Sequence, residues 1–423
     1  MDHGGLSVVA RDRLRHVTVV GGSAAGLAAA HGLRRRGFDG PITVFGDEPR
    51  AAYQRPALSK RFLTSPDIGP DDILLRADAE DVTLEPGVRA TGLDLGTRRL
   101  RLRDTHGGVE RHHTVDGLVI ATGATARRLP VDTPEGVHVL RTLADAAAFR
   151  ADLAGSPRVA VVGAGFVGSE VASSCRALGL DVTLVEAGTA PMARALGDVV
   201  GAELAALHRD HGTRLRLGAG VAGFTGDGRV TGVRLTDGHV VPADVVLVGV
   251  GARPATGWLE GSGLPLEDGV VCGPDLAVAD RIVAAGDVAR WPHHRGGTLI
   301  RVEHWDNALR QADAAAATLL APAGAASPFT ATTMFWSDQY DCKLQLVGHP
   351  LPGDEATVVE GDPRERRCVI AYRRAGEITA ALLCNSPHRL RAYRQAVATG
   401  HTGTGHTASG AADAPPPVPQ AAP

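Results

Sequence analysis

Hydrophobic and polar positions along this chain fall into blocks that predict buried strands followed by helices. The first block is a run of apolar or β-branched residues at 17–20, followed by apolar residues at helical spacing from Ala24 to Arg36. The run predicts a buried strand, and the spacing predicts an amphipathic helix that Gly37 ends. A second apolar run at 42–45 predicts another buried strand. Strand, helix and strand in this order form a βαβ unit.

The turn between the first strand and its helix consists of small residues. It covers positions 21–26 with the sequence GGSAAG, so that Ser23 replaces the middle glycine of the usual fingerprint. Such a turn lets backbone N–H groups at a helix N-terminus approach a pyrophosphate. Asp47, at the end of the second strand, is placed to accept hydrogen bonds from the ribose of an adenosine. A glycine turn alone is typical of many loops, but this order of elements predicts a dinucleotide site.

The same pattern returns in the middle of the chain with a complete GxGxxG turn. An apolar run at 158–162 precedes the turn, a helix is predicted at 169–178, and the next strand ends at Glu186. The glycines of this turn are Gly163, Gly165 and Gly168. Glu186 would accept hydrogen bonds from a free 2′-hydroxyl and repel a 2′-phosphate, and no arginine follows it directly. The second unit therefore predicts a site that prefers NADH to NADPH.

Apolar runs elsewhere predict the remaining elements and the domain order. They predict a meander of short strands at 82–102, strands at 118–123, 245–251 and 282–285, a helix at 306–320, strands at 344–347, 368–372 and 378–383, and a helix at 388–398, with residues 252–254 breaking the strand before them. Because strand ends typical of the first unit resume after the second one, we expect the second domain to be inserted into the first. The predicted fold is α/β, with two Rossmann-like dinucleotide-binding domains and a C-terminal α+β domain.

Two dinucleotide domains in one chain indicate two cofactors that face each other. FAD in the outer domain and NADH in the inner one is the natural pair, because a nicotinamide passes hydride to a flavin. The predicted FAD-binding domain covers 14–123 and 246–322, the NAD-binding domain 124–245, and the C-terminal domain 323–399. The segment 400–423, rich in Gly, Thr, Ala and Pro, is expected to be disordered.

Composition narrows the class of protein further. The chain has 423 residues, 44% of them hydrophobic, and a net charge of −3, which does not favour nucleic-acid binding. No apolar stretch is long enough for a membrane span, and no signal peptide is visible. The five cysteines are scattered and form no CxxC pair. We therefore expect a cytoplasmic protein with reduced thiols, no metal site and no membrane or nucleic-acid partner.

Lysine is nearly absent from this chain. Lys60 and Lys343 are the only lysines among 44 basic residues. Lys60 ends the run Tyr-Gln-Arg-Pro-Ala-Leu-Ser-Lys at 53–60. A rare lysine at the end of this run is a candidate functional residue. The alternative is a surface lysine in a loop.

These motifs together resemble the FAD-dependent pyridine-nucleotide oxidoreductases. Within them the chain is most similar to the ferredoxin and rubredoxin reductases that supply oxygenases, the putidaredoxin reductase type. The resemblance covers about residues 15–398 and rests on the runs 53–60, 121–123, 163–170, 285–287, 301–308 and 335–340. The last two runs are typical of this subgroup rather than of the fold.

The resemblance, together with the glycine turns, implies a set of cofactor contacts. The implied FAD-binding residues are Gly21, Ser23, Ala24, Ala25, Gly26, Asp47, Arg55, Lys60, Ala90, Thr122, Gly123, Arg141, Gly286, Asp287, Glu303, Trp305 and Trp336. The implied NAD-binding residues are Gly163, Gly165, Phe166, Val167, Gly168, Glu170, Glu186 and Gly251. For Phe166 and Trp336 the alternative is a packed hydrophobic side chain without a cofactor contact.

By the same resemblance, Lys60 and Glu170 form the catalytic pair beside flavin N5. A cation there stabilises the negative charge that arrives on the flavin with the hydride. The carboxylate holds the cation in position.

Three functions on this fold remain open. A disulfide or peroxide reductase needs a nucleophilic cysteine near the flavin, but residues 55–63 contain none and Cys175 is the nearest in sequence. One-electron delivery to a small acidic iron–sulfur protein, a 2Fe–2S ferredoxin or a rubredoxin that feeds an oxygenase, suits a thiol-free site. A flavoprotein similar to apoptosis-inducing factor, whose conformation or association responds to NADH, is the third possibility. The oligomeric state cannot be read from the sequence.

An acidic acceptor would favour a basic docking face. The basic residues considered for this face are Arg310, Lys343, Arg364, Arg366, Arg367, Arg373 and Arg374. Runs of charge such as these are equally typical of solvated surface.

Overall fold

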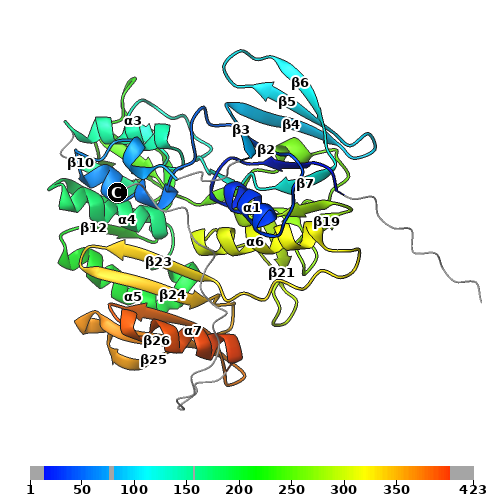
Figure 1. Cartoon of the computed structure of the whole chain (residues 1–423). Coiled ribbons are helices and arrows are strands. Elements are labelled where there is room, and N and C mark those ends of the chain that lie inside the picture. The colour runs from blue at the N-terminus through cyan, green and yellow to red at the C-terminus, as the bar shows by residue number, and fades with distance from the viewer. Residues whose placement is uncertain (1–13, 76–80, 156–157, 401–423) are drawn as a thin grey trace, which may run out of the picture.

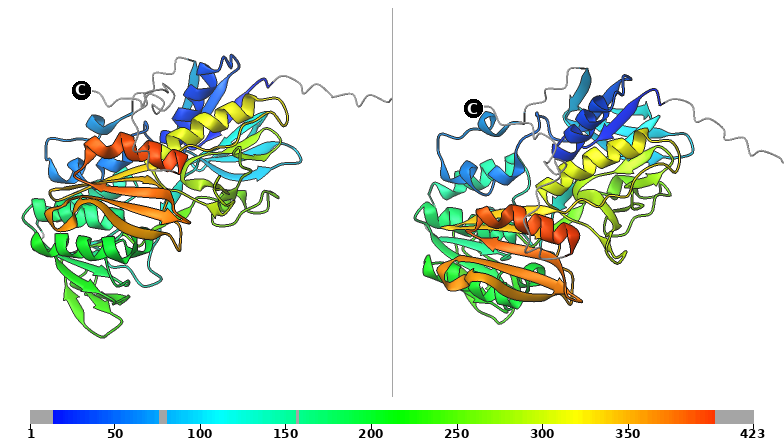
Figure 2. Two further views of the ribbon diagram at one scale, coloured as in Figure 1. Left: turned by 90° about the horizontal axis from the view of Figure 1, so that it is seen from below. Right: turned by 60° about the horizontal axis from the view of Figure 1, so that its bottom comes forward.

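The computed structural model describes residues 14–75, 81–155 and 158–400. They form two parallel-sheet domains and a smaller C-terminal domain, which lies beside the second of them (Figures 1 and 2). The predicted disordered segment lies outside the described residues from 401 onward. Among the described residues, no helix is long and apolar enough to cross a membrane.

The first domain is built on a six-stranded sheet in the order β19-β20-β7-β1-β2-β3. These strands are β1 Val17–Val20, β2 Ile42–Gly46, β3 Val82–Pro86, β7 Gly117–Ile120, β19 Ala277–Ala279 and β20 Ile282–Ala284. All neighbouring pairs are parallel except β19 with β20. Strands that flank the inserted domain in the sequence, β7 and β20, are thus neighbours in the sheet.

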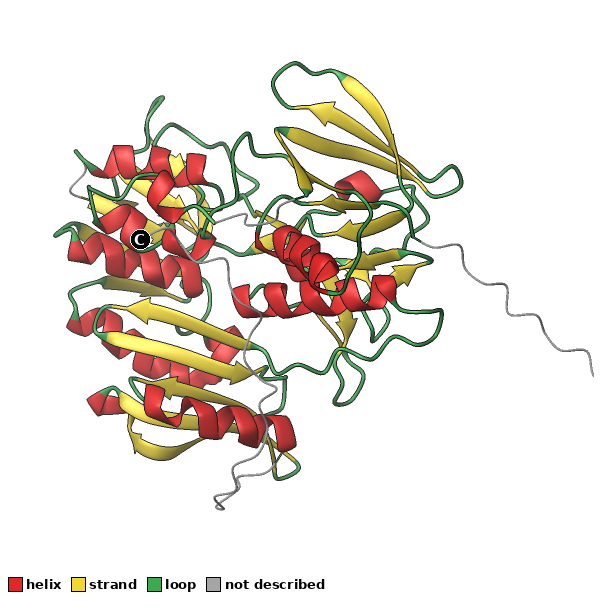
Figure 3. Ribbon diagram, in the orientation of Figure 1, coloured by secondary structure: helices red, strands yellow, loops and turns green. Residues whose placement is uncertain are grey.

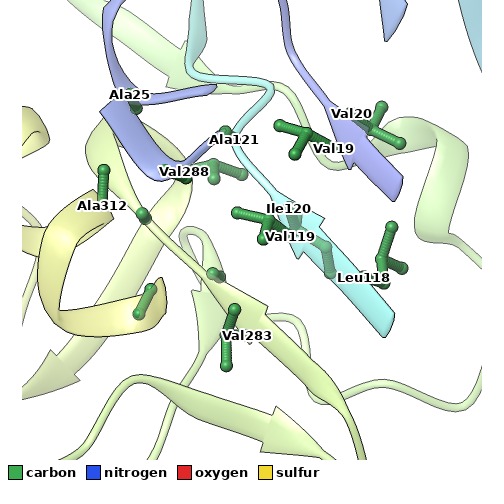
Figure 4. Close-up of a cluster of buried hydrophobic side chains, with 14 of the residues drawn as sticks. Val19, Val20, Ala25, Leu118, Val119, Ile120, Ala121, Val283, Val288 and Ala312 are labelled. Atoms are coloured by element: carbon green, nitrogen blue, oxygen red, sulfur yellow. The ribbon is translucent and has the colours of Figure 1, made fainter. Parts of the chain in front are cut away.

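Two helices, α1 (Ala24–Arg35) and α6 (Trp305–Leu320), lie side by side in the first domain (Figure 3). They approach closely because α1 carries Gly32, where an added Cβ would lie 3.1 Å from the Cβ of Ala316. Figure 4 shows Val19, Val119 and Val283, from three neighbouring strands, in the same core as Ala312 of α6. Each fully buried aliphatic side chain of this kind contributes about 1.5–3 kcal/mol.

A three-stranded antiparallel meander extends from the first domain. Its strands are β4 Val88–Asp94, β5 Arg99–Asp104 and β6 Glu110–Thr114. The predicted meander at 82–102 was therefore placed too early, because β3 joins the parallel sheet. Short elements in the same domain are α2 Arg61–Thr64, β18 Val270–Val271, β21 Ala289–Pro292 and β22 Leu299–Ile300.

The second domain has a five-stranded parallel sheet in the order β12-β11-β10-β16-β9. Its strands are β9 Val137–His138, β10 Arg158–Val162, β11 Asp181–Glu186, β12 Arg214–Leu217 and β16 Val245–Val248. The helices α3 Leu143–Leu153, α4 Phe166–Ala177 and α5 Ala193–Asp210 accompany it. An antiparallel sheet adds β13 Val221–Thr225, β14 Gly232–Leu235 and β15 Val240–Pro242.

The passage between the two domains differs from the prediction. Strand β16 pairs with β10, so the predicted return to the first domain at residue 246 falls inside a strand of the second sheet. The segment 252–254, expected to break a strand, itself forms a short strand, β17 (Ala252–Pro254), which pairs with β8 (Ala124–Ala126). This two-stranded ribbon carries the chain out of and back into the first domain.

The C-terminal domain is a five-stranded antiparallel sheet in the order β23-β24-β27-β26-β25. Its elements are β23 Met334–Gln339, β24 Cys342–Gly348, β25 Glu355–Asp362, β26 Arg367–Arg374, β27 Glu377–Cys384 and α7 Leu390–Thr399. Alternating side chains of its strands pack on α7, and the opposite set packs on α5 of the second domain. The predicted fold class is confirmed.

Candidate active site

A cavity of about 910 Å³ lies where the three domains meet. The first domain lines it with the turn after β1, the residues after β2, β7 and β20, and the start of α6. The second domain contributes Phe166, Val167, Glu170, Arg194 and Ala195, and the C-terminal domain contributes Phe335, Trp336 and His349. The carboxyl ends of parallel strands at such a crevice are the usual ligand site of α/β folds.

The glycine turn after β1 is shaped for a phosphate group. Gly21 has φ +126°, and a Cβ there would lie 2.0 Å from the carbonyl oxygen of Ala121. The following helix α1 has Ser23 as its N-cap, but the serine side chain makes no capping hydrogen bond. Its first-turn N–H groups therefore lack a side-chain acceptor and can donate to an anion in the cavity. The residues of this turn fit the pyrophosphate of a dinucleotide.

The turn before α4 repeats this arrangement in the second domain. Gly163 has φ +96°, and the helix N-cap Gly165 offers no side-chain acceptor. Glu186 reaches back to this turn, because its Oε2 accepts from the backbone N–H of Ala164 at 2.7 Å. The N-terminus of α4 is thus open toward an anion beside an acidic side chain at the end of β11, as a dinucleotide requires.

Two predicted fingerprint glycines have a packing role in the structure. A Cβ on Gly26 would lie 1.8 Å from the carbonyl oxygen of Gly21, and one on Gly168 would lie 1.9 Å from that of Gly163. Both positions let the helix approach its own turn and neither lines the cavity.

Most of the predicted FAD-binding residues line the cavity. They are Gly21, Ser23, Ala24, Ala25, Asp47, Arg55, Lys60, Thr122, Gly123, Arg141, Gly286, Asp287, Glu303, Trp305 and Trp336. Ala90 does not, because the alternation along β4 turns its side chain into the core of the first domain. Of the predicted NAD-binding residues, Phe166, Val167 and Glu170 line the cavity, whereas Gly163, Gly165, Gly168, Glu186 and Gly251 lie outside its lining.

Ion pairs hold several polar side chains of the cavity in place. Arg141 Nη2 lies 2.6 Å from Asp287 Oδ2, and Arg55 Nη2 lies 2.6 Å from Glu48 Oε1. Arg55 also donates to the carbonyl oxygen of Arg141 at 2.7 Å. Asp47 stays more than half exposed, 3.5 Å from Arg89, so its carboxylate can accept hydrogen bonds from a ligand.

Lys60 and Glu170 form a buried ion pair across the boundary between the first and second domains. Lys60 Nζ lies 2.6 Å from Glu170 Oε2, and the two side chains are 20% and 6% exposed. Two hydroxyl groups also donate to this carboxylate, Ser59 at 2.5 Å and Ser337 at 2.7 Å. The predicted pairing of Lys60 with Glu170 is therefore present in the structure, and both side chains line the cavity.

Aromatic side chains from different domains meet at the same end of the cavity. The ring centroids of Phe166 and Phe335 are 4.0 Å apart, and those of His304 and Phe335 are 5.1 Å apart. Burial lowers the pKa of His304 to about 3, so this imidazole is neutral at pH 7. Burial also lowers the pKa of His349. The buried Nδ1 atoms of both histidines have no hydrogen-bond partner among the described residues.

The two histidines, Ser59 and Ser337 were not identified as site residues from the sequence. His304 lies inside the motif at 301–308 and Ser59 inside the motif at 53–60, so a signal existed for both. His349 follows a β-strand in a segment without a motif. Its place at the cavity depends on how the C-terminal sheet packs.

Among the seven basic residues considered for a docking face, Arg310, Arg366 and Arg374 are paired with carboxylates in the structure. Arg310 is buried and pairs with Asp306 at 2.7 Å. Arg366 pairs with Asp210 and Asp341, and Arg374 with Asp354. These arginines are neutralised by neighbouring carboxylates, which a sequence pattern does not reveal.

Thiol chemistry has no place at this cavity. All five cysteines are described, free and buried, and none of them lines the cavity. Burial raises the pKa of Cys175 to about 12, so this thiol stays protonated at pH 7. Elsewhere, within the described ranges, no cluster of three or more His, Cys, Asp or Glu side chains could hold a metal ion.

Comparison with known proteins identifies the family. The sequence profile described as pyridine nucleotide-disulphide oxidoreductase matches residues 15–312, and the profile described as reductase C-terminal matches residues 334–415. The chain belongs to the pyridine nucleotide-disulphide oxidoreductase family. The predictions of an oxidoreductase of this family and of FAD and NAD(H) as cofactors are confirmed.

Similar members of the family are reductases, and one of them is a component of a dioxygenase system. Rhodocoxin reductase of Rhodococcus erythropolis is 39% identical over 82% of this chain and 80% of its own length. The ferredoxin–NAD(+) reductase component of the p-cumate 2,3-dioxygenase system of Pseudomonas putida is also 39% identical, over 82% of this chain and 84% of its own length. The reductase in a crystal structure of the covalent putidaredoxin reductase–putidaredoxin complex superimposes with a TM-score of 0.85 at 30% identity, covering 92% of this chain and 94% of that one.

Proposed function

We propose that this chain is an NADH-dependent reductase that passes electrons through FAD to a small iron–sulfur protein, a 2Fe–2S ferredoxin or a rubredoxin, which in turn feeds an oxygenase. The observation that carries this proposal is a cavity with a buried Lys–Glu pair and no thiol. A site without a thiolate has no covalent relay for a disulfide or peroxide. The similar ferredoxin–NAD(+) reductase component of a dioxygenase system supports the same acceptor class.

The chain's own groups would hold FAD along the cavity. The N–H groups at the start of α1 would bind the pyrophosphate, and Asp47 would bind the adenosine ribose. Arg141, fixed by Asp287, would donate to a polar edge of the cofactor. When bound, FAD supplies the hydride acceptor and the conversion of an electron pair into single electrons.

Lys60 would act on the reacting end of the flavin. Its ammonium is held by a carboxylate that is almost fully buried, so its charge is poorly screened by solvent. A fixed cation there stabilises negative charge that develops during hydride transfer without having to reorganise. Glu170 keeps the cation in place rather than reacting itself.

The second domain would bind NADH. The start of α4 would hold its pyrophosphate, and Glu186 would accept hydrogen bonds from the adenosine ribose hydroxyls. Phe166 contacts Phe335 at one end of the cavity, so a nicotinamide ring that enters between them must separate the two rings. Five free cysteines further support the proposal that the protein works in a reducing, cytoplasmic compartment.

One experiment separates the possible acceptors. The purified flavoprotein is reduced with NADH without oxygen and then mixed separately with a 2Fe–2S ferredoxin, a rubredoxin and a disulfide, while oxygen is offered in a fourth mixture. Rapid reoxidation by ferredoxin or rubredoxin, with slow reaction elsewhere, is the expected result. A long-lived reduced flavin that neither iron–sulfur protein reoxidises would favour the alternative similar to apoptosis-inducing factor, and rapid disulfide reduction would contradict the thiol-free argument.

A further inference from the structure

We propose that Ser337, in the C-terminal domain, is a positioning residue for the Lys60–Glu170 pair. It donates a hydrogen bond to the Glu170 carboxylate from strand β23, so the C-terminal domain takes part in orienting the pair. The proposal rests on the function proposed above for Lys60 and Glu170.

The three hydrogen-bond donors divide the carboxylate of Glu170 between them. Ser337 Oγ lies 2.7 Å from Oε1, while Ser59 Oγ lies 2.5 Å and Lys60 Nζ 2.6 Å from Oε2. The Ser337 side chain donates to Oε1, and Ser59 and Lys60 donate to Oε2. Because both oxygens are hydrogen-bonded, the carboxylate is held in one orientation. With Oε1 held, Oε2 stays directed at Lys60.

The proton of Ser337 is itself directed toward Glu170. Gln339 Nε2 donates to Ser337 Oγ at 3.1 Å, which uses an acceptor lone pair of the serine. A serine hydroxyl has a single proton, and in the structure Ser337 donates it to Glu170 Oε1. Gln339 therefore donates to Ser337 and Ser337 donates to Glu170, while Lys60 donates to the other oxygen of the same carboxylate.

The position of Ser337 in its strand is costly for a polar side chain unless it is hydrogen-bonded. Ser337 is fully buried, and it pairs with Leu344 in the sheet. Phe335, Ser337 and Gln339 alternate along β23 and share one face of it. Phe335 on that face contacts Phe166 of the second domain, so this face of β23 covers the candidate active site. A buried hydroxyl here is explained by the carboxylate that it serves.

Loss of the Ser337 hydroxyl would leave Oε1 of a buried carboxylate without this donor. Glu170 could then turn, and the time that Lys60 spends in the productive position would fall. The expected effect is a rate of flavin reduction by NADH roughly tenfold lower, equivalent to about 1.4 kcal/mol, with the dissociation constant of NADH changed by less than about twofold. The flavin midpoint potential should also fall, because a cation held less firmly stabilises the reduced form less.

The experiment compares Ser337→Ala with the matched control Ser386→Ala in the FAD-loaded full chain. Ser386 is also a buried serine of the C-terminal domain, but its hydroxyl donates to the backbone carbonyl of Cys384 at 2.9 Å. Stopped-flow flavin reduction, the NADH dissociation constant and the flavin midpoint potential are measured for both. If the alanine variant does not retain FAD, Ser337→Cys, which keeps a weaker donor of similar size, replaces it.

A double-mutant cycle with Lys60→Met decides between a positioning role and a structural one. If Ser337 acts through the ion pair, Ser337→Ala slows reduction in the wild-type background and has no further effect in Lys60→Met. A rate and potential equal to those of Ser386→Ala, or the same loss in both backgrounds, would overturn the proposal. If Lys60→Met itself reduces at the wild-type rate, the proposed role of Lys60 fails, and the inference about Ser337 fails with it for a distinguishable reason.

Discussion

Replacing Lys60 with methionine removes the ammonium group and keeps an unbranched side chain of similar length. In the structure this group lies 2.6 Å from Glu170 Oε2, and the lysine side chain is 20% exposed. Glu170 keeps two hydroxyl donors, from Ser59 and Ser337. The substitution therefore removes one positive charge from the cavity and leaves a buried carboxylate that is still partly hydrogen-bonded.

The expected losses follow from this geometry. Removing a preorganised electrostatic group from a water-poor site costs about a hundredfold or more in rate, or about 2.7 kcal/mol of transition-state stabilisation. The stability cost is about 3 kcal/mol, at the low end for breaking a buried pair, because the two serines still hold the carboxylate. The NADH dissociation constant should change little, since the charge acts on the transition state more than on the bound substrate.

The assay is anaerobic stopped-flow reduction of the bound flavin over a range of NADH concentrations. It separates the limiting rate from the dissociation constant. Arg61→Met is the matched control, because Arg61 is the adjacent cation, is exposed and does not line the cavity. Wild-type limiting rates in Lys60→Met, with FAD fully bound, would refute the assignment of Lys60.

Three further predictions concern cofactor choice, pH and the first glycine turn. Glu186→Ser removes the charge that would repel a 2′-phosphate, and steady-state kinetics should show the preference for NADH over NADPH reduced by roughly tenfold or more; an unchanged preference would place the discrimination elsewhere. His208 is fully buried, its Nδ1 lies 2.8 Å from the Tyr340 hydroxyl oxygen, and burial lowers its pKa to about 4. The unfolded chain binds this proton at about pH 6.5, and the folded chain binds it only near pH 4. This difference does not affect the free energy of unfolding above pH 6.5. As the pH falls from 6.5 to 4, it lowers the free energy of unfolding by up to about 3 kcal/mol. Urea unfolding at several pH values should show that the His208→Gln variant loses less stability at low pH than the wild type. An equal loss in both proteins would show that His208 does not contribute to this pH dependence. Gly21→Ala should abolish FAD retention, because its Cβ would meet the carbonyl oxygen of Ala121 at 2.0 Å. Gly37 also has a positive φ, +79°, but open space around it, so Gly37→Ala should lower the free energy of unfolding by only about 1 kcal/mol while FAD binding stays normal.

Local patterns in the sequence were sufficient for the two cofactor-binding units. A strand, a glycine turn, a helix and an acidic residue follow one another within a short stretch, and each is governed by contacts between near neighbours. The turns at Gly21 and Gly163 have the positive φ angles that only glycine adopts without strain. The repeat of this pattern was therefore enough to predict the fold class and both cofactors.

Tertiary structure decided which side chains complete the site and which are withdrawn from it. Ser59 and Ser337 reach Glu170 across 111 and 167 residues of sequence, and no local pattern encodes such a meeting. Arg310, basic in the sequence, is buried beside Asp306, one helical turn away. Ala90 is directed into the core by the alternation of its strand. Helical and strand periods are set by the backbone and can be read from sequence, whereas contacts between domains depend on how three separately built cores pack together, which only the folded chain determines.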